Sequence, residues 1–462
     1  MKNFLGYHSE WNLGSPGGWD YQRITQELGK FCWDRLNEVM KLDIPLNFSH
    51  PLLNPVPLFA EMLLRAHKKR HPGEKPYIVL TAEPDTIGTV VENSNFVKYL
   101  NSIPGVSAEL AAPHEFEEKN GQIYLKGKPV TLIYMDFNND VILELEKEYD
   151  LSALKKAIEY KVVVNPRGME PVGAKGVFEA VTDTYKDKFF GTTVERTPWT
   201  RRFFARSTTG PEGEKIKDLV EWTRKNIERL ILKPVQGYSG KGIVIGFKSE
   251  TPDEDIEKAL KLNNYIVQEL VPLNLWAEES PWLDDNAEEV ILKRWQTDFR
   301  CLITDGGLIG FLGRFGGIPT NVGSGGGTQA LAILPGDTST KELVDQINRS
   351  ILSIPYSTLK EIKESVDEKA VEMGHTYLLG PIKTALRPRL INEAQVEALT
   401  EYSVNLWKDA VKLEQMWREG KLDEFVDIAE EEIRLARLAP WNGEPALMAA
   451  DGLFSFGGHP DE

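Results

Sequence analysis

One stretch decides the fold of this chain: Ile231-Leu232-Lys233-Pro234-Val235-Gln236-Gly237-Tyr238-Ser239-Gly240-Lys241-Gly242-Ile243. An apolar strand carries Lys233 into a glycine-rich turn, and the apolar run from Ile243 to Ile245 closes the hairpin. Glycines let successive backbone N–H groups converge on one point, and the lysines add positive charge beside it. The stretch therefore predicts an anion cradle suited to a triphosphate. A glycine hairpin with a solvated lysine is the alternative.

This stretch is neither of the two common nucleotide-binding loops. A Walker motif requires glycine at position 235 and Ser or Thr after Lys241, where this chain has Val235 and Gly242. A dinucleotide fingerprint requires the order G-x-G-x-x-G followed by a helix, and that order is absent. The fold must therefore be inferred from this stretch together with the other segments of the chain.

Composition excludes several classes of protein. A chain of 462 residues is long enough for two or three domains, and its net charge of −16 argues against a broad surface for nucleic acid or anionic membranes. The sequence shows no signal peptide and no run of membrane-spanning length. Its two cysteines, Cys32 and Cys301, lie far apart without metal-ligand spacing. We expect a soluble, cytoplasmic protein without disulfides.

The pattern along the chain predicts four regions. Residues 1–75 are expected to be helical or irregular, and residues 76–170 an α/β subdomain with strands at 77–80, 130–135 and 161–164. Residues 171–337 form a strand-rich core that opens with a helix over 174–186. Residues 338–462 are mainly helical, with helices near 357–373, 392–418 and 421–438 that offer a surface for a homodimer. The aromatic tail from 439 is expected to pack back onto the body.

A second glycine-rich loop follows two strands that carry arginines. The strand Trp295–Ile303 alternates in polarity, so Asp298 and Arg300 point to the same face. The next strand ends at Arg314, and the loop 319–328 begins with Pro-Thr-Asn and contains Asn321. Two glycine loops together with Lys233 and these arginines indicate a polyphosphate site. An ion pair between Asp298 and Arg300 on one face of a sheet is the alternative.

A polar pair ends the strand that lies between the two loops. In Tyr265-Ile266-Val267-Gln268-Glu269-Leu270-Val271-Pro272, apolar residues lead to Gln268 and Glu269 before a proline. The pattern fits a hinge whose backbone edge pairs with adenine. It fits equally a buried strand with polar ends.

Taken together, these segments resemble the ATP-grasp ligases. The order "LKP" before a glycine loop, then "VQEL", then "DFR…GR…N…GGG" is similar to the circularly permuted variant of that family, which includes glutathionylspermidine synthase and eukaryotic-type glutathione synthetase. The match covers roughly residues 130–335. It implies an α/β (α+β) fold of the permuted ATP-grasp type, with an N-terminal α/β subdomain and a helical C-terminal region.

The resemblance also implies a metal site and a phosphate ligand. In the permuted fold the metal-binding strand precedes the glycine loop, which points to Asp136 and Asn138 as Mg²⁺ ligands. Lys175 occupies the place of a phosphate-contacting lysine. A strand-end turn and a surface helical lysine are the alternatives for these residues.

This chain departs from the family pattern at three places. Many permuted relatives carry an arginine pair where it has Met135-Asp136, and a Lys-Asp pair where it has Gln329-Ala330. The acidic metal ligand of the first glycine loop is replaced near Gly237. These departures leave the acyl substrate and the complete set of metal ligands open.

The function that the resemblance implies is ATP-dependent joining of a small-molecule acid to an amine through an acyl phosphate, with ATP and Mg²⁺ as cofactors and with no nucleic-acid or membrane partner. An ATP-grasp phosphotransferase and a non-catalytic nucleotide-binding protein are the alternatives. Catalysis is assigned to Arg314, Arg300 and Lys233. Nucleotide binding is assigned to Lys175, Lys233, Gly237, Tyr238, Ser239, Gly240, Lys241, Gln268, Glu269 and Asn321.

Overall fold

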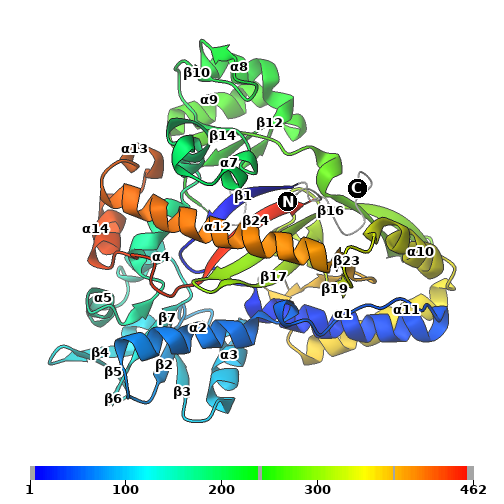
Figure 1. The fold of residues 1–462 in the computed structure, drawn as a ribbon, viewed down its shortest axis with the longest axis horizontal. Helices are drawn as coiled ribbons and strands as arrows, with labels where there is room; N and C mark the ends of the chain where they lie inside the picture. The colour runs from blue at the N-terminus through cyan, green and yellow to red at the C-terminus, as the bar shows by residue number, and fades with distance from the viewer. Residues whose placement is uncertain (1–5, 238–241, 378–379, 455–462) are drawn as a thin grey trace.

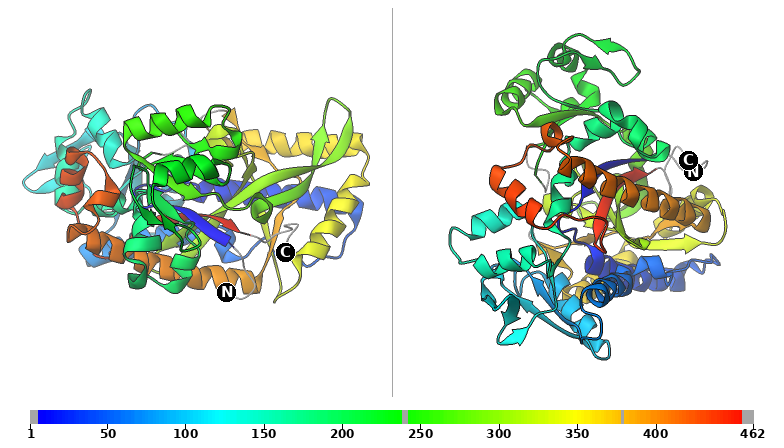
Figure 2. Two further views of the ribbon diagram at one scale, coloured as in Figure 1. Left: turned by 90° about the horizontal axis from the view of Figure 1, so that it is seen from above. Right: turned by 60° about the vertical axis from the view of Figure 1, so that its left-hand side comes forward.

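The chain folds around three main β-sheets with helices between and around them (Figure 1). The computed structural model describes residues 6–237, 242–377 and 380–454. A central sheet lies between a small antiparallel sheet and a parallel sheet, and the right-hand view of Figure 2 shows these two at opposite ends of the molecule. The mixed α/β class expected from the sequence is confirmed.

The central sheet holds strands from both ends of the chain. Its order is β1-β24-β16-β17-β18-β22, and β15 pairs with β16. Its strands are β1 (Gly6–Asn12), β15 (Ala277–Asp284), β16 (Glu289–Thr304), β17 (Gly307–Gly316), β18 (Gly327–Thr328), β22 (Lys383–Thr384) and β24 (Met448–Phe454). The helix α12 (Glu393–Arg418) packs on one face, and α1 (Trp19–Met40) and α2 (Pro55–Arg70) contact the same sheet (Figure 1). Every residue of β17 is consequently buried.

Residues 6–12 form a strand, β1, which pairs with β24, whereas this part of the chain was expected to be helical or irregular. The two strands run antiparallel, with Gly6 opposite Phe454 and Asn12 opposite Ala449. The tail therefore packs back onto the body, as expected, but it does so as a strand. Residues 6–12 were expected to be helical or irregular because their polar and apolar residues follow no clear period. Their strand conformation depends on a partner at the far end of the chain.

The small sheet carries the hairpin predicted from the sequence. Its order is β13-β12-β14-β9, and β12 pairs with β13 through Ile231 opposite Ile245. Its strands and covering helices are β9 (Thr200–Arg202), β12 (Leu230–Pro234), β13 (Val244–Ile245), β14 (Tyr265–Glu269), α8 (Leu219–Asn226) and α9 (Pro252–Leu262). The apolar faces of β12, β14 and these helices form one hydrophobic cluster.

The parallel sheet confirms the α/β alternation expected over 76–170. Its order is β3-β2-β7-β8. Its elements are β2 (Tyr77–Thr81), α3 (Val91–Ser102), β3 (Ser107–Ala111), β7 (Leu132–Met135), α5 (Ser152–Glu159) and β8 (Val163–Val164). β2 and β7 are buried at every position, as is typical of parallel strands with both faces covered. Tyr134 and Leu80 pack in one cluster with Trp19 and Phe59, which joins this sheet to α1 and α2.

The helices expected in the last region are present, with one interruption. The structure has α11 (Tyr356–Glu372) and α12 where helices near 357–373 and 392–418 were predicted. The helix predicted over 421–438 is divided into α13 (Asp423–Val426) and α14 (Glu430–Leu438), because Asp427 adopts a left-handed backbone conformation, with φ of 45°. The helix expected over 174–186 is reduced to α6 (Val177–Glu179) and a π-helical turn, Ala180–Thr184.

The remaining elements are short or lie at the periphery. They are β4 (Phe116–Lys119), β5 (Gln122–Leu125), β6 (Lys128–Pro129), α4 (Asn139–Leu145), α7 (Gly191–Glu195), β10 (Thr208–Thr209), β11 (Lys215–Ile216), β19 (Leu331–Leu334), α10 (Thr340–Leu352), β20 (Thr376–Tyr377), β21 (Gly380–Pro381) and β23 (Arg389–Asn392). Within the described residues, the helices are too short or too polar to cross a lipid bilayer.

The close approach of α6 to α13 gives a test of the packing. A Cβ atom on Gly176 would lie 2.0 Å from the carbonyl oxygen of Phe425, whereas a Cβ atom on Gly191 would meet nothing within 4 Å. Gly176→Ala should therefore lower the free energy of unfolding by about 1–3 kcal/mol, as overpacking does. Gly191→Ala serves as the control, and urea denaturation measures both. Equal stability of the two variants would contradict this packing.

Candidate functional site

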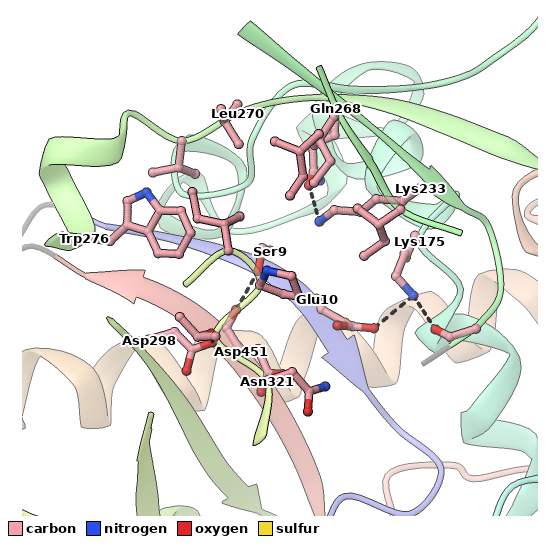
Figure 3. A pocket seen from close by; sticks show the side chains of 18 of the residues that line it. Ser9, Glu10, Lys175, Lys233, Gln268, Leu270, Trp276, Asp298, Asn321 and Asp451 are labelled. Atoms are coloured by element: carbon pink, nitrogen blue, oxygen red, sulfur yellow. Dashed lines mark hydrogen bonds and ion pairs between the residues drawn. The ribbon is translucent and has the colours of Figure 1, made fainter. Parts of the chain in front are cut away.

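The candidate site is a cavity between the small sheet and the central sheet (Figure 3). β12 and β14 of the small sheet line one side, and β1, β16, β17 and β24 of the central sheet line the other. The loop 318–321 and Lys175 complete the wall. The site thus collects residues from both ends and from the middle of the chain.

Two lysines enter the cavity side by side (Figure 3). Lys233, on β12, donates a hydrogen bond of 2.7 Å from Nζ to Oε1 of Gln268 on the neighbouring strand. Lys175 donates from Nζ to the carbonyl oxygen of Gly237, at 2.7 Å, and forms an ion pair of 2.9 Å with Oε1 of Glu10. Six of the predicted nucleotide-binding residues line this cavity: Lys175, Lys233, Gly237, Gln268, Glu269 and Asn321.

Burial makes the charge of Lys233 easy to remove. Its side chain is 9% exposed, and this burial, followed by the nearby charge of Lys175, lowers the pKa of Lys233 to about 8. The carboxylates of Glu10 and Asp451 act in the opposite direction. A bound anion would add to their effect and favour the protonated lysine.

The rest of the predicted glycine loop lies outside the described residues. Tyr238, Ser239, Gly240 and Lys241 belong to this part of the chain. Its two flanks are described: Gly237 has a φ of 122° and Gly242 a φ of 74°, both in the left-handed region that favours glycine.

The far end of the cavity is apolar. Trp276 lies at the opposite end from the lysines in Figure 3, and its Nε1 is buried without a hydrogen-bond partner among the described residues. Glu269 also lines the cavity, and burial raises its pKa above the usual range. The apolar side chains that line the cavity are Ile231, Ile243, Ile245, Leu270, Val271 and Ile318. A cavity with a cationic end and an apolar end suits an amphipathic anion.

The floor of the cavity is a chain of buried ion pairs. Arg314 on β17 stands directly opposite Asp298 on β16, and its Nε donates to Oδ1 of Asp298 at 2.7 Å. Asp451 on β24 accepts from Nη2 of Arg314 at 3.0 Å and from Nε and Nη2 of Arg300 at 2.8 and 2.9 Å. These guanidinium groups hold the pKa of the Asp451 carboxyl well below its usual range.

Arg300 and Arg314 were predicted to bind phosphate, but in the structure both are already paired with carboxylates. Both line the cavity, as expected, but each already has a carboxylate partner, so fewer of their N–H groups are free for phosphate. The ion pair weighed between Asp298 and Arg300 is not the one formed, because the antiparallel register places Arg314 opposite Asp298. Asp451 was missed because it follows an apolar run in a tail with no recognisable pattern.

An acidic-x-Asn pair that the sequence analysis overlooked also faces this cavity. Glu10 and Asn12 lie two positions apart on β1, so both side chains point to the cavity side. The pattern of an acidic residue and an asparagine before a glycine-rich stretch, here Gly14–Gly18, was a usable signal. It was passed over because residues 1–75 were expected to lack strands.

The predicted metal ligands lie in a second cavity. Asp136 and Asn138 follow β7 and line this cavity together with residues of α1 and the loop after β2. Lys175 and Lys233 line the first cavity, whereas Asp136 and Asn138 line the second. The two cavities adjoin, since they share Asn12, Arg300, Arg314 and Asn321 as lining residues.

Neither cavity is a preformed closed metal centre. Within the described residues, no group of three His, Cys, Asp or Glu side chains is placed to hold a metal ion. Glu10 and Asn12 nevertheless offer the carboxylate and amide oxygens that Mg²⁺ prefers, and Mg²⁺ commonly takes the rest of its ligands from water and phosphate. The donor set on β1 therefore fits a magnesium ion that arrives with a phosphate.

Comparison with known proteins gives weak structural likenesses. The putative gamma-glutamylcysteine synthetase of Methylobacillus flagellatus is 12% identical over 80% of this chain and 99% of that chain, with a TM-score of 0.31. D-alanine–D-alanine ligase of Bacillus anthracis is 11% identical over 62% and 79%, with a TM-score of 0.30. The RimK domain ATP-grasp protein of Sphaerobacter thermophilus is 12% identical over 50% and 71%, with a TM-score of 0.29.

No family model matches the chain, and no curated protein matches it. TM-scores this low do not establish a shared fold. What the site can do is therefore decided by its own residues.

Removing the carboxylate of Asp451 tests whether its ion pairs with Arg300 and Arg314 stabilise the protein. Asp451→Asn should lower the free energy of unfolding by about 3–5 kcal/mol, because the buried guanidinium of Arg314 and the half-buried one of Arg300 lose their common partner. Asp305→Asn, which breaks only the exposed pair with Arg65, should cost at most about 1 kcal/mol. Urea denaturation followed by tryptophan fluorescence compares the two. A loss for Asp451→Asn as small as that of the control would mean that the ion-pair chain is not formed.

Proposed function

We propose that this protein is an ATP-dependent carboxylate–amine ligase that forms an amide through an acyl phosphate, on a circularly permuted ATP-grasp fold. One observation carries the proposal: Lys233 from the small sheet and Lys175 from the segment before α6 face an acidic-x-Asn pair from the central sheet across a cavity whose other end is apolar. This is the polarity of Mg·ATP, which carries its charge at one end and its base at the other.

The nucleotide lies between the two sheets in this proposal. The base occupies the apolar end beside Trp276 and Leu270, and the phosphates reach Lys175 and Lys233. Glu10, Gln268 and the Gly237 carbonyl hold the two ammonium groups in position before any ligand binds, so little reorganisation is needed on binding. Arginine and lysine side chains recognise phosphate by charge-assisted hydrogen bonds.

Glu10 and Asn12 hold the magnesium ion in this proposal. They share the cavity with both lysines, whereas Asp136 and Asn138, the pair suggested by the family resemblance, line the second cavity. Bound Mg²⁺ would neutralise phosphate charge and favour the developing transition state. The ion pair with Lys175 keeps the carboxylate of Glu10 in position for the metal until the nucleotide binds.

The reaction takes place where the two cavities meet. A substrate carboxylate attacks the γ-phosphorus, the bond to the β-phosphate oxygen breaks, and an acyl phosphate and ADP result. An amine then attacks the carbonyl carbon, phosphate leaves with the electron pair of the C–O bond, and the amine loses its proton. Arg300 and Arg314 stand at this junction and stabilise the negative oxygens. The protein contributes position and charge, as in other phosphoryl transfers.

Trapping with hydroxylamine tests the acyl phosphate. Purified protein with Mg²⁺, ATP, pooled carboxylic acids and hydroxylamine should release ADP and produce a hydroxamate from one acid, because hydroxylamine replaces the amine as nucleophile. Mass spectrometry identifies the product. ADP formation with a stable phosphorylated product and no hydroxamate would instead indicate a phosphotransferase. Absence of any ATP turnover with every pool would contradict catalysis.

Two charge-removing variants test the site assignment. Lys233→Met and Glu10→Gln should each lower ATP turnover by about 100-fold, the usual cost of losing one aligned electrostatic group. Lys225→Met and Glu228→Gln, at exposed positions outside the cavity, are the matched controls and should retain full turnover. If Asp136→Asn abolished Mn²⁺-dependent turnover while Glu10→Gln did not, the metal would belong to the second cavity.

The lowered pKa of Lys233 predicts a pH dependence of nucleotide binding. The lysine is charged below its pKa of about 8 and neutral above it, so affinity for Mg·ATP should fall by about tenfold from pH 7 to pH 9. Lys233→Arg stays charged throughout this range and should lose the pH dependence. Isothermal titration calorimetry measures both proteins. A fall of the same size in Lys233→Arg would assign the titration to another group.

A further inference from the structure

The second cavity opens at the carboxyl ends of the parallel strands β2 and β7. Glu83 follows the end of β2 by two residues, and Asp136 follows β7 directly. In the sheet, β2 and β7 are neighbours. The chain leaves β2 toward β3 on one side and leaves β7 toward β8 on the other, so the connections after these two strands run in opposite directions. Ligands bind in such crevices in open α/β sheets, outside the strand ends. The cavity is therefore placed for a ligand by the topology of the sheet itself.

The carboxylates in this cavity lack cationic partners. Glu83 is half-buried and makes no side-chain hydrogen bond or ion pair with the described residues, and burial raises its pKa. Asp136 accepts a hydrogen bond of 2.6 Å from Nδ2 of Asn93, and burial together with the charge of Glu83 raises its pKa to about 6. Oδ1 of Asn93 is also buried without a partner among the described residues.

The arginines that could compensate the charges of Glu83 and Asp136 already pair with other carboxylates. Arg300 and Arg314, at the border of the cavity, are paired with Asp451 and Asp298. Glu92, also in this cavity, is satisfied differently, because it accepts hydrogen bonds from the backbone N–H groups of Gly18, Asp20 and Tyr21 at the start of α1. Two carboxylates thus remain that a cationic ligand would satisfy.

Aromatic rings line the same space. Tyr21 and Tyr377 meet edge to face, with ring centroids 5.9 Å apart, and Tyr21 donates a hydrogen bond from its hydroxyl to the carbonyl oxygen of Thr376. Phe137 and apolar side chains such as Val141 and Ile382 complete the lining. Carboxylates combined with aromatic faces and apolar walls recognise an organic ammonium group rather than a hydrated metal ion.

We propose that the second cavity binds the amine substrate as its ammonium cation, between Glu83 and Asp136 and beside the rings of Tyr21 and Tyr377. Naming this cation as the amine that is ligated rests on the proposed function, while the preference for a cation does not.

A pair of probes that differ only in charge tests the preference. n-Butylammonium and butyrate have the same number of carbons, and ligand-detected NMR titration at pH 8, without nucleotide, measures their binding to the full chain. The wild-type protein should bind n-butylammonium, whereas butyrate, which only the lysines of the first cavity attract, should bind equally to the wild type and to variants of the second cavity. Glu83→Gln and Asp136→Asn should each weaken n-butylammonium binding by about tenfold, the effect of removing one partly buried charge partner.

Asp85→Asn is the matched control, because Asp85 is an exposed carboxylate close to Glu83 that does not line the cavity. It should bind n-butylammonium as the wild type does, and thermal unfolding verifies that all variants are folded. n-Butylammonium binding that is unchanged in both cavity variants, or butyrate binding that weakens with it in these variants, would overturn the proposal. So would Mg²⁺ alone displacing n-butylammonium from the wild type but not from Asp136→Asn, since the cavity would then be a metal site.

The outcome separates this inference from the proposed ligase activity. If n-butylammonium binds as expected but no acid yields a hydroxamate, the cation site stands and the ligase proposal fails. If amide synthesis occurs and the KM for its amine is the same in the wild type and in Glu83→Gln, the ligase stands and the amine site lies elsewhere.

Discussion

The carboxylate of Asp451, shared between Arg300 and Arg314, is the interaction on which the site depends. It links β24 to β16 and β17, and β24 in turn pairs with β1, which carries Glu10 and Asn12. Arg314, Asp298 and Asp451 are buried and Arg300 is half-buried beside them. Removing the carboxylate of Asp451 therefore leaves guanidinium charges uncompensated in a region of low dielectric. The same ion pairs fix the arginines at the border of the two cavities. The geometry of the candidate site and the pairing of the central strands therefore depend on the same ion pairs.

The sequence predicted the local features of the fold well. The hairpin that carries Lys233, the buried strands β2 and β7, and the helices α11 and α12 each follow from a pattern within one segment. Lys175, Lys233, Gly237 and Gln268, which were predicted to form one binding site, line the same cavity. The hairpin and its neighbouring strand determine the positions of Lys233, Gly237 and Gln268.

The features that depend on distant pairing were not predictable in the same way. β1 reads as a mixed polar segment and becomes a strand only against β24, so Glu10-x-Asn12 was passed over. Asp451 acquires its role from two arginines on other strands. The assignment of metal ligands to Asp136 and Asn138 had a sound local pattern, an acidic-x-Asn pair after an apolar strand. Sequence alone does not tell that this strand ends at the second cavity rather than beside the lysines.

Two cavities meet at the arginines: lysines line the first, and the second holds carboxylates without a cationic partner among the described residues. In the proposed reaction, a substrate carboxylate at this junction lies within reach of a phosphate donor on one side and of an amine on the other. Transfer of ¹⁸O tests this arrangement most directly, using the acid found by hydroxamate trapping with both carboxylate oxygens labelled. Formation of an acyl phosphate predicts one ¹⁸O atom in each phosphate released with the amide. Unlabelled phosphate, or ¹⁸O in AMP, would contradict it.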